Sequence, residues 1–330
     1  MVDGESSVSW SKDTAFRNNR ARKYGGAVYV KGGSTVSWNA STVFYSNFGP
    51  DFEGGGGAVC VANGSSVFWS GTRTFDSNFA FTNGEALLIT SGSSVSWSGI
   101  TTYVDNDLEW IGGEGGAVYV EDSSSASWSA NTTFLRNEAS LSGGALYVSY
   151  TSVSWTGETE FRDNSAEKGG AVYLVGSSLS WMSWSGATEF VGNTAIVYGG
   201  AVYIEESCNV SWTGDTKFKS NSATLEDGGA VATGALSGEC GADSTLIING
   251  TTTFEKNEAS LNGGGLAMRG GCALTVGAMA DVSFVGNLAG VAGGAVFLSV
   301  AALGPVFTGA SFISNSAEIG GGVSIFGSGN

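Results

Sequence analysis

Three features of the 330-residue sequence predict an all-β fold, a single-stranded right-handed parallel β-helix. Phe or Tyr followed three residues later by Asn recurs 11 times, which gives 30 residues per repeat. Gly-Gly-Ala-Val, or a close variant, lies between each copy of that motif and the next. Within each repeat, apolar residues alternate with period two, which is typical of strands. Three strands and three turns in about 30 residues form one coil of such a solenoid, so we expect about 11 coils.

The composition agrees with a folded repeat protein. Glycine supplies 53 residues and proline only 2, while 42% of the chain is hydrophobic and 13% is charged. This chain is too apolar to be disordered. No apolar run approaches the ~20 residues that a membrane-spanning helix needs, so no membrane insertion is expected. Since no linker interrupts the array, residues 1–330 are expected to form one domain.

Each repeat supplies three strand segments, and their alternation predicts which side chains face the core. In the first segment, Ser-Val-Ser-Trp, we place Val and Trp inside and Ser outside. In the second, Thr-x-Phe, the aromatic residue faces inward. In the third, the aliphatic residue after Ala, such as Val118, faces inward, because its burial stabilises the fold by about 1.5–3 kcal/mol. The next residue, such as Tyr119, then points outward.

The residues between the strands predict the turns. The Asn of Phe-x-x-Asn tolerates left-handed backbone angles, and its amide can donate to the same Asn of the next coil. A small residue two positions later, such as Ala139 or Ala166, indicates a tight corner. The glycine pair is expected to supply a second corner with positive φ. The Asn, the small residue and the glycine pair each recur at an equivalent position of the repeat and so form columns along the stack. We interpret all three columns as structural.

Composition also excludes several functions. The net charge is −16, which argues against a nucleic-acid partner, because phosphate binding needs a basic face. The chain has no His, so Ser-His and Cys-His catalysis cannot occur. Without His or Cys-x-x-Cys spacing, no zinc site is expected. We therefore predict no metal, no cofactor and no catalytic residue.

One outward column is a candidate binding surface. Tyr119, Tyr147, Tyr173 and Tyr203 occupy it in four consecutive coils. If exposed, four stacked tyrosines would form a flat aromatic strip that suits a sugar chain or a partner protein. The alternative is that they stack on one another and cover the strand backbone.

Acidic and threonine columns give weaker candidates. Glu160 and Glu189 share an outward position in adjacent coils, about 5 Å apart, a spacing that suits a retaining glycosidase. Lys217 continues this column, so a solvated face of mixed charge also explains it. Thr74, Thr102 and Thr133 precede Glu160 in the same column, and such a threonine row could bind ice.

Two acidic clusters could bind Ca²⁺, but each also fits a solvated acidic turn, and no known calcium loop is present. They are Asp105/Asp107/Glu109/Glu114 and Glu226/Asp227.

Cysteines and sequons suggest modification. Cys208, Cys240 and Cys272 follow the third strand in consecutive coils, so Cys208–Cys240 or Cys240–Cys272 could form a disulfide, and we favour the second. Cys60 is expected to be free. Five sequons fall at positions that we interpret as outward or in turns, where a glycan could be attached. They are Asn39, Asn63, Asn131, Asn209 and Asn249.

The two alternating motifs, for example Phe16-x-x-Asn19 and Gly25-Gly26-Ala27-Val28, resemble the repeats of chlamydial polymorphic outer membrane proteins. The resemblance extends over essentially the whole chain, although Ser-Val-Ser-Trp is not part of that signature. Similar Trp-rich repeats occur in secreted algal and protist proteins. The resemblance implies an autotransporter-type passenger, a surface-exposed β-helix that works as an adhesin.

We therefore expect an extracellular or cell-surface rod that acts as an adhesin or as a structural component, without enzymatic activity. The alternatives are a polysaccharide-acting β-helix enzyme (lyase, hydrolase or epimerase) and a glycan- or ice-binding module. The expected partner is a protein or glycan on a cell surface or in an extracellular matrix. Both terminal coils look uncapped, so end-to-end self-association, or a place within a longer array, is also expected.

Overall fold

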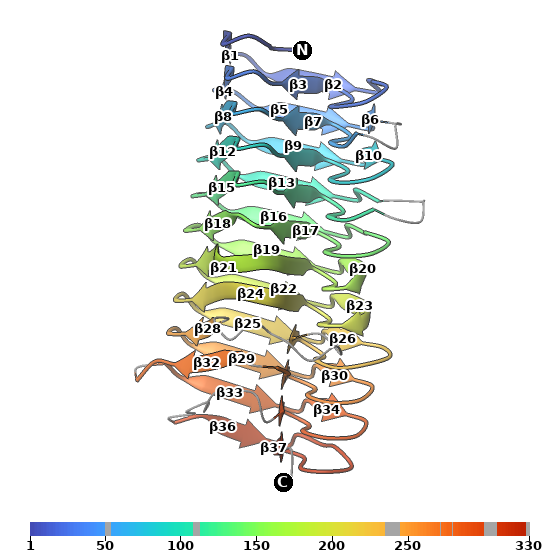
Figure 1. The fold of residues 1–330 in the computed structure, drawn as a ribbon, viewed down its shortest axis with the longest axis vertical. Helices are drawn as coiled ribbons and strands as arrows, with labels where there is room; N and C mark the ends of the chain where they lie inside the picture. Colours follow the sequence, from blue (N-terminus) through green and yellow to red (C-terminus); the bar gives the residue numbers. More distant parts are fainter. Residues whose placement is uncertain are drawn as a thin grey trace.

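The chain folds into a straight stack of coils with the two termini at opposite ends (Figure 1). This computed structural model describes residues 1–49, 54–107, 113–234, 245–270, 272–278, 280–299 and 309–327. Within those ranges every strand pairing is parallel and there is no helix. That part of the chain therefore contains no helix that could cross a membrane. The predicted parallel β-solenoid with its tandem repeats is confirmed.

The Thr-x-Phe segments form one sheet of 11 strands, stacked in chain order. The strands are β2 (Thr14–Arg17), β5 (Thr42–Tyr45), β9 (Arg73–Asp76), β13 (Thr101–Val104), β16 (Thr132–Leu135), β19 (Thr159–Arg162), β22 (Thr188–Val191), β25 (Thr216–Lys219), β29 (Thr252–Glu255), β33 (Val282–Val285) and β36 (Ser311–Ile313). Equivalent residues lie opposite one another throughout, as in the pairing of Phe134 with Phe161.

The other two predicted segments join into a single sheet of 19 strands. Its Ser-Val-Ser-Trp strands are β1 (Ser7–Trp10), β4 (Thr35–Trp38), β8 (Ser66–Trp69), β12 (Ser94–Trp97), β15 (Ser125–Trp128), β18 (Ser152–Trp155), β28 (Thr245–Ile248) and β32 (Ala273–Val276). Its Ala-Val-Tyr-Val strands are β3 (Val28–Val30), β7 (Val59–Val61), β11 (Leu87–Ile89), β14 (Val118–Val120), β17 (Leu146–Ser149), β27 (Val231–Thr233), β31 (Leu266–Met268), β35 (Val296–Ser299) and β37 (Val323–Phe326). The two sets belong to one sheet because β21 (Val172–Trp184) and β24 (Val202–Trp212) run through both.

Short strands form a further face where a corner was predicted. They are β6 (Phe48–Gly49), β10 (Phe79–Ala80), β20 (Ser165–Lys168), β23 (Thr194–Tyr198), β26 (Ser222–Ala223), β30 (Glu258–Ala259) and β34 (Leu288–Ala289). The small residue of this segment, such as Ala195, is a buried strand residue. The second glycine of the pair packs against the backbone of this segment in the next coil. A Cβ on Gly170, for instance, would lie 2.5 Å from the carbonyl oxygen of Thr194.

The core consists of stacked side-chain columns, as predicted. Seven tryptophans, from Trp38 to Trp212, are at most 1% exposed, and neighbouring rings lie 4.2–6.1 Å apart. The phenylalanine column stacks beside them, with ring centroids 4.7 Å apart between Phe134 and Phe161. Stacking of identical residues in consecutive coils therefore supplies the hydrophobic core.

The predicted asparagine ladder runs through the whole rod. Each Nδ2 donates to the Oδ1 of the next coil's asparagine at 2.8–3.1 Å. Each Nδ2 from Asn47 onward also donates to a carbonyl oxygen of the preceding coil, as Asn164 does to Phe134 at 3.1 Å. The positive backbone φ angle lies on the residue before each ladder asparagine, such as Arg136 or Asp163, which is one position earlier than predicted. The ladder asparagine itself is thereby free to point inward.

Candidate functional site

The tyrosine column was the main candidate for a binding surface, and its stacking is as predicted. Tyr119, Tyr147 and Tyr173 pair in register, with ring centroids 4.5 and 5.0 Å apart. Tyr203 follows them at 5.7 Å with a tilted ring. The predicted exposure is wrong, however, because the four tyrosines are only 0–8% exposed.

The tyrosines are buried because the segment that leads into a glycine pair crosses over them. The first glycine of the pair lies against the outward residue of its own coil, as Gly199 does against Tyr203, or of the next coil, as Gly115 does against Tyr147. A Cβ on Gly115 would meet Tyr147 Cβ at 3.1 Å. Tyr198, at the end of β23, packs on Tyr203 with a centroid distance of 5.3 Å. The column is thus a second hydrophobic cluster outside the main core.

Carboxylates accompany the tyrosine hydroxyls at the edge of this cluster. Tyr173 donates a hydrogen bond to Glu205, and Tyr147 hydrogen-bonds to Glu114. Burial raises the pKa of Glu114 and of Glu121 above the ordinary carboxyl value. Burial also raises the pKa of Tyr173 far above its ordinary value, so its hydroxyl stays protonated as a donor. On this face the carboxylate groups lie at the edge of the cluster, and the aromatic rings are buried beneath the surface.

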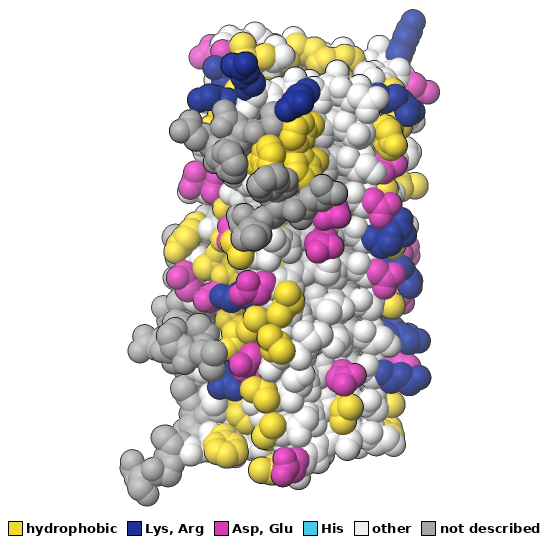
Figure 2. Space-filling view, turned by 90° about the vertical axis from the view of Figure 1, so that its right-hand side faces the viewer, with side chains coloured by type: hydrophobic (Ala, Val, Ile, Leu, Met, Phe, Trp, Pro, Cys, Tyr) yellow, Lys and Arg dark blue, Asp and Glu magenta, His cyan; other side chains and the backbone are white. Residues whose placement is uncertain are grey.

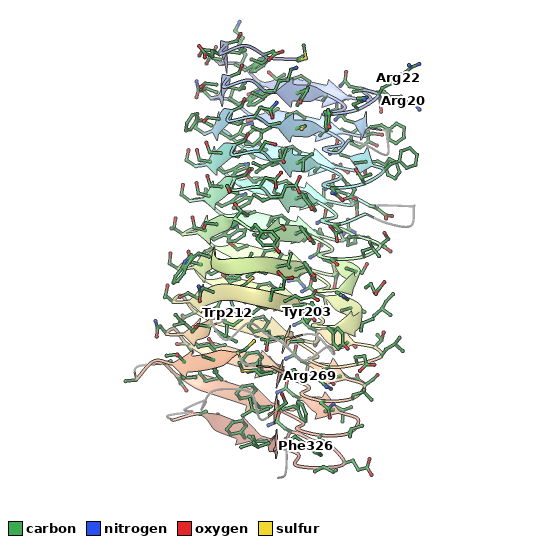
Figure 3. All side chains as sticks on the ribbon, in the orientation of Figure 1. Arg20, Arg22, Tyr203, Trp212, Arg269 and Phe326 are labelled. Atoms are coloured by element: carbon green, nitrogen blue, oxygen red, sulfur yellow. The ribbon has the colours of Figure 1, made fainter. Side chains whose placement is uncertain are left out.

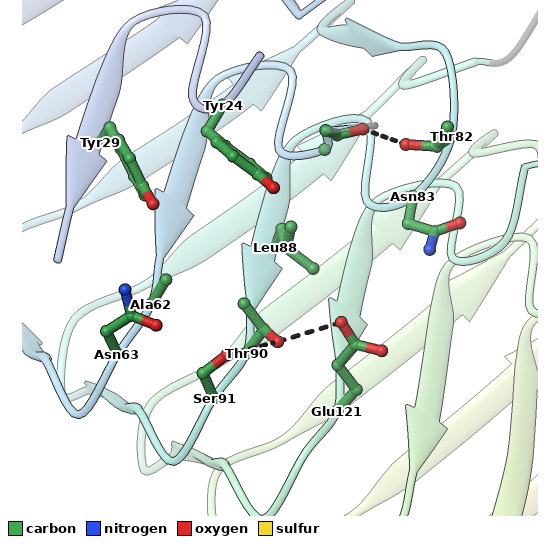
Figure 4. Close-up of a pocket in the computed structure, with 12 residues that line it drawn as sticks. Tyr24, Tyr29, Ala62, Asn63, Thr82, Asn83, Leu88, Thr90, Ser91 and Glu121 are labelled. Carbon is green, nitrogen blue, oxygen red and sulfur yellow. Dashed lines mark hydrogen bonds between the residues drawn. The ribbon is translucent and has the colours of Figure 1, made fainter. Parts of the chain in front are cut away.

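One hollow opens on this face nearer the N-terminus, beside the second to fourth coils. It has a volume of about 400 Å³. Its lining consists of Tyr24, Tyr29, Gly54, Gly55, Ala62, Asn63, Thr82, Asn83, Leu88, Thr90, Ser91 and Glu121 (Figure 4). Unlike the four predicted tyrosines, Tyr24 and Tyr29 are half-buried and keep part of their surface accessible.

The predicted glutamate pair lies on the outer side of the 11-stranded sheet. Glu160 and Glu189 are paired in register and line a hollow of about 440 Å³, together with Glu158. Arg162 forms an ion pair with Glu160, and Lys217 continues the column beside Glu189. The column therefore carries both signs of charge, which fits the interpretation as a solvated face. The threonine row of Thr74, Thr102 and Thr133 is also in register and ends at Glu160.

Asp105 and Asp227, one from each proposed calcium cluster, have other partners. Asp105 accepts two hydrogen bonds from Arg136, at 2.7 and 2.8 Å. Asp227 is 1% exposed and binds Asn262 and Arg269, so a solvated turn is wrong at that residue. Glu109 lies outside the described residues. Among the described residues, no group of three or more His, Cys, Asp or Glu could hold a metal ion.

The cysteines differ in state. Cys272 is disulfide-bonded, while Cys240, its expected partner, lies outside the described residues. Cys208 keeps its thiol, which donates to the carbonyl oxygen of Glu205 at 3.3 Å, so the pairing Cys208–Cys240 is wrong. Cys60 is a free, buried thiol, as predicted. Burial raises the pKa of Cys208 to about 12 and that of Cys60 still higher, so both thiols are unreactive.

The sequons lie where a glycan could be attached. The side chains of Asn39, Asn63, Asn131 and Asn249 are exposed, and that of Asn209 is half-buried.

The remaining surface is of mixed character. Figure 2, which faces the side of the short strands, shows hydrophobic side chains in separate patches, with acidic and basic side chains following one another down one edge. Ile196, Leu225 and Leu288 are 43–60% exposed near the short strands. Arg20 and Arg22 project from the edge of the first coil (Figure 3).

Sequence reasoning missed two buried charges. Arg73 occupies the inward threonine column between Thr42 and Thr101, and its guanidinium has no hydrogen-bond partner among the described residues. Glu85 replaces the second glycine of its pair and is fully buried, with no hydrogen-bond partner for its carboxyl group in that same part of the chain. Both could have been recognised in the sequence, because Arg73 interrupts a column of threonines and Glu85 interrupts a column of glycines.

The fold and its repeated ladders define the chain as a parallel β-solenoid of in-register repeats. Residues 13–31 match the Chlamydia polymorphic membrane protein repeat. The matched stretch contains both motifs, from Phe16 and Asn19 to the glycine pair at Gly25. Over that stretch, the resemblance drawn from the motifs is confirmed. No curated protein and no solved structure matches the chain.

Proposed function

We propose that the chain is the exposed rod of a cell-surface protein, where it acts as an adhesin or as a structural component. The repeat family and the solenoid fold both fit a surface protein of this kind. The observation that carries the proposal is that the two motifs of the matched stretch recur in register along the rod. Such an array gives a long surface of repeated outward side chains, which suits contact with an extended partner.

The structure also favours a rod that has no catalytic activity. Of the predicted pair, Glu160 forms an ion pair with Arg162, and Lys217 lies in register beside Glu189. A glycosidase needs one carboxyl group free to give a proton to the leaving oxygen. An incubation with neutral and acidic polysaccharides should therefore release no new reducing ends or unsaturated products. Turnover that the double variant E160Q/E189Q abolishes would instead establish the enzyme.

Adhesion is tested with the purified chain, fluorescently labelled and applied to intact cells and to immobilised extracellular-matrix proteins. We expect saturable binding to at least one of these surfaces, lost after heat unfolding because the outward columns then separate. A folded chain that binds none of them would contradict the adhesin role and leave the structural one. Light scattering over a hundredfold concentration range then tests self-association, which the structural role requires.

A further inference from the structure

The hollow beside the second to fourth coils exists because the tyrosine column is interrupted there. Tyr29, Cys60, Leu88 and Tyr119 occupy the same outward position in successive coils and pair in register. Cys60 and Leu88 are smaller than the tyrosines on either side of them. Leu88 lines the hollow of about 400 Å³, so the space that a tyrosine ring would fill at this position is part of it, whereas Cys60 is fully buried. That volume lies within the usual range for small-molecule sites.

The hollow has an aromatic wall. Tyr24 and Tyr29 stack at 5.2 Å between ring centroids, with 27° between their planes. Both are half-buried, so neighbouring protein holds the rings while part of their surface faces the hollow. Leu88 lies between these rings and the opposite wall in Figure 4 and gives the floor an apolar patch.

The opposite wall is polar. Thr90 donates a hydrogen bond to Glu121 Oε1 at 3.0 Å, which holds the carboxylate at the rim. Ser91 and Asn63 lie beside Thr90, and Asn83 stands on the far side of Leu88 (Figure 4). Hydroxyl, amide and carboxylate groups therefore converge on a space bounded by two aromatic rings.

We propose that this hollow binds a sugar residue. A pyranose ring has an apolar C–H face, which packs on aromatic side chains, and hydroxyl groups, which need donors and acceptors around their rim. The negative charge of Glu121 and the net charge of −16 disfavour uronic and sialic acids, so the ligand is a neutral or amino sugar. This inference rests on the proposed adhesin function and gives its partner a chemical class.

The test uses the full chain made without N-glycosylation, because Asn63, which lines the hollow, is also a sequon. Saturation-transfer NMR is recorded with methyl β-glucoside, methyl β-galactoside, N-acetylglucosamine and glucuronic acid as separate probes. We expect at least one of the first three to bind with a millimolar Kd, and glucuronic acid to bind at least tenfold more weakly.

Two variants locate the site. Tyr24→Ala removes half of the aromatic wall, and Leu88→Tyr fills the hollow with the residue that the same column uses in later coils. Each should weaken sugar binding at least tenfold, and Leu88→Tyr should keep the fold because its ring can stack on Tyr119. Tyr150→Ala, at a 54% exposed tyrosine outside the hollow, is the matched control and should leave the Kd unchanged.

The outcomes separate this inference from the proposed function. If no probe binds, if glucuronic acid binds best, or if both hollow variants bind as the wild type does, the sugar site is overturned. Cell binding by the wild-type chain would then still support the adhesin role. If sugars bind in the hollow but the chain is never exposed on intact cells, the site stands and the proposed function fails.

Discussion

Replacing one asparagine in the middle of the ladder should destabilise the protein more than an ordinary core truncation. Asn164→Ala removes two hydrogen bonds that the side chain donates, to Phe134 and to Asn193. It also removes two that its Oδ1 accepts from the backbone and side chain of Asn137. All four partners lie in the buried interior, where water cannot replace them.

The expected loss follows from these four bonds. At about 1–1.5 kcal/mol for each, Asn164→Ala should lower the free energy of unfolding by about 4–6 kcal/mol. Asn315→Ala, at the half-buried end of the ladder, is the matched control. It loses three bonds, but water reaches the groups left behind, so a loss of about 2 kcal/mol or less is expected.

Urea unfolding followed by tryptophan fluorescence measures both variants, because the stacked tryptophans report loss of the coils. Since a solenoid can unfold in parts, amide hydrogen exchange at Asn137 and Asn193 checks that the loss is local to neighbouring coils. A loss below about 1 kcal/mol for Asn164→Ala, or equal losses for both variants, would refute the reasoning.

Three further predictions concern buried groups. Arg73→Met should raise the free energy of unfolding by about 1–3 kcal/mol in a urea titration at pH 7, because the guanidinium is buried without a hydrogen-bond partner among the described residues and lies over the Trp69 ring face at 5.7 Å; an unchanged midpoint would contradict this. Burial raises the pKa of Glu85 well above 4.5, so the folded state holds a proton that the unfolded state releases, and stability should fall as pH rises above about 4.5. Tm measured from pH 5 to 8 should show this fall, and Glu85→Gly should make Tm less dependent on pH. If the variant keeps the pH dependence of the wild type, groups other than Glu85 cause it. Maleimide labelling read by mass spectrometry should modify Cys60 and Cys208 only after unfolding, and Cys272, which is also buried, only after unfolding and reduction; labelling of Cys60 or Cys208 in the native protein would contradict the burial argument.

Most of the fold could be predicted because each structural column is visible as a repeated residue. The inward positions of Trp, Phe and Val follow from period-two alternation and from burial. The positive φ on the first glycine of each pair, such as Gly115, also follows from sequence. The short strands escaped prediction because two to five residues carry too little periodicity, and a buried alanine looks the same in a strand as at a corner.

The candidate site was less predictable. Alternation tells which side of a strand Tyr147 points to, but it cannot tell that another segment of the coil lies over that side. The hollow depends on the opposite signal, the smaller Leu88 at a position that Tyr29 and Tyr119 occupy in other coils. Arg73 and Glu85 gave the same kind of signal, since each departs from its column. Departures from a repeat were thus more informative about sites than the repeat itself.

The central claim is that this rod faces the outside of a cell. Antibodies raised against the purified chain should label intact source cells without permeabilisation, and protease added to those cells should remove the label. A cytoplasmic marker in the same cells must stay unlabelled and intact. Labelling that appears only after permeabilisation would contradict the account.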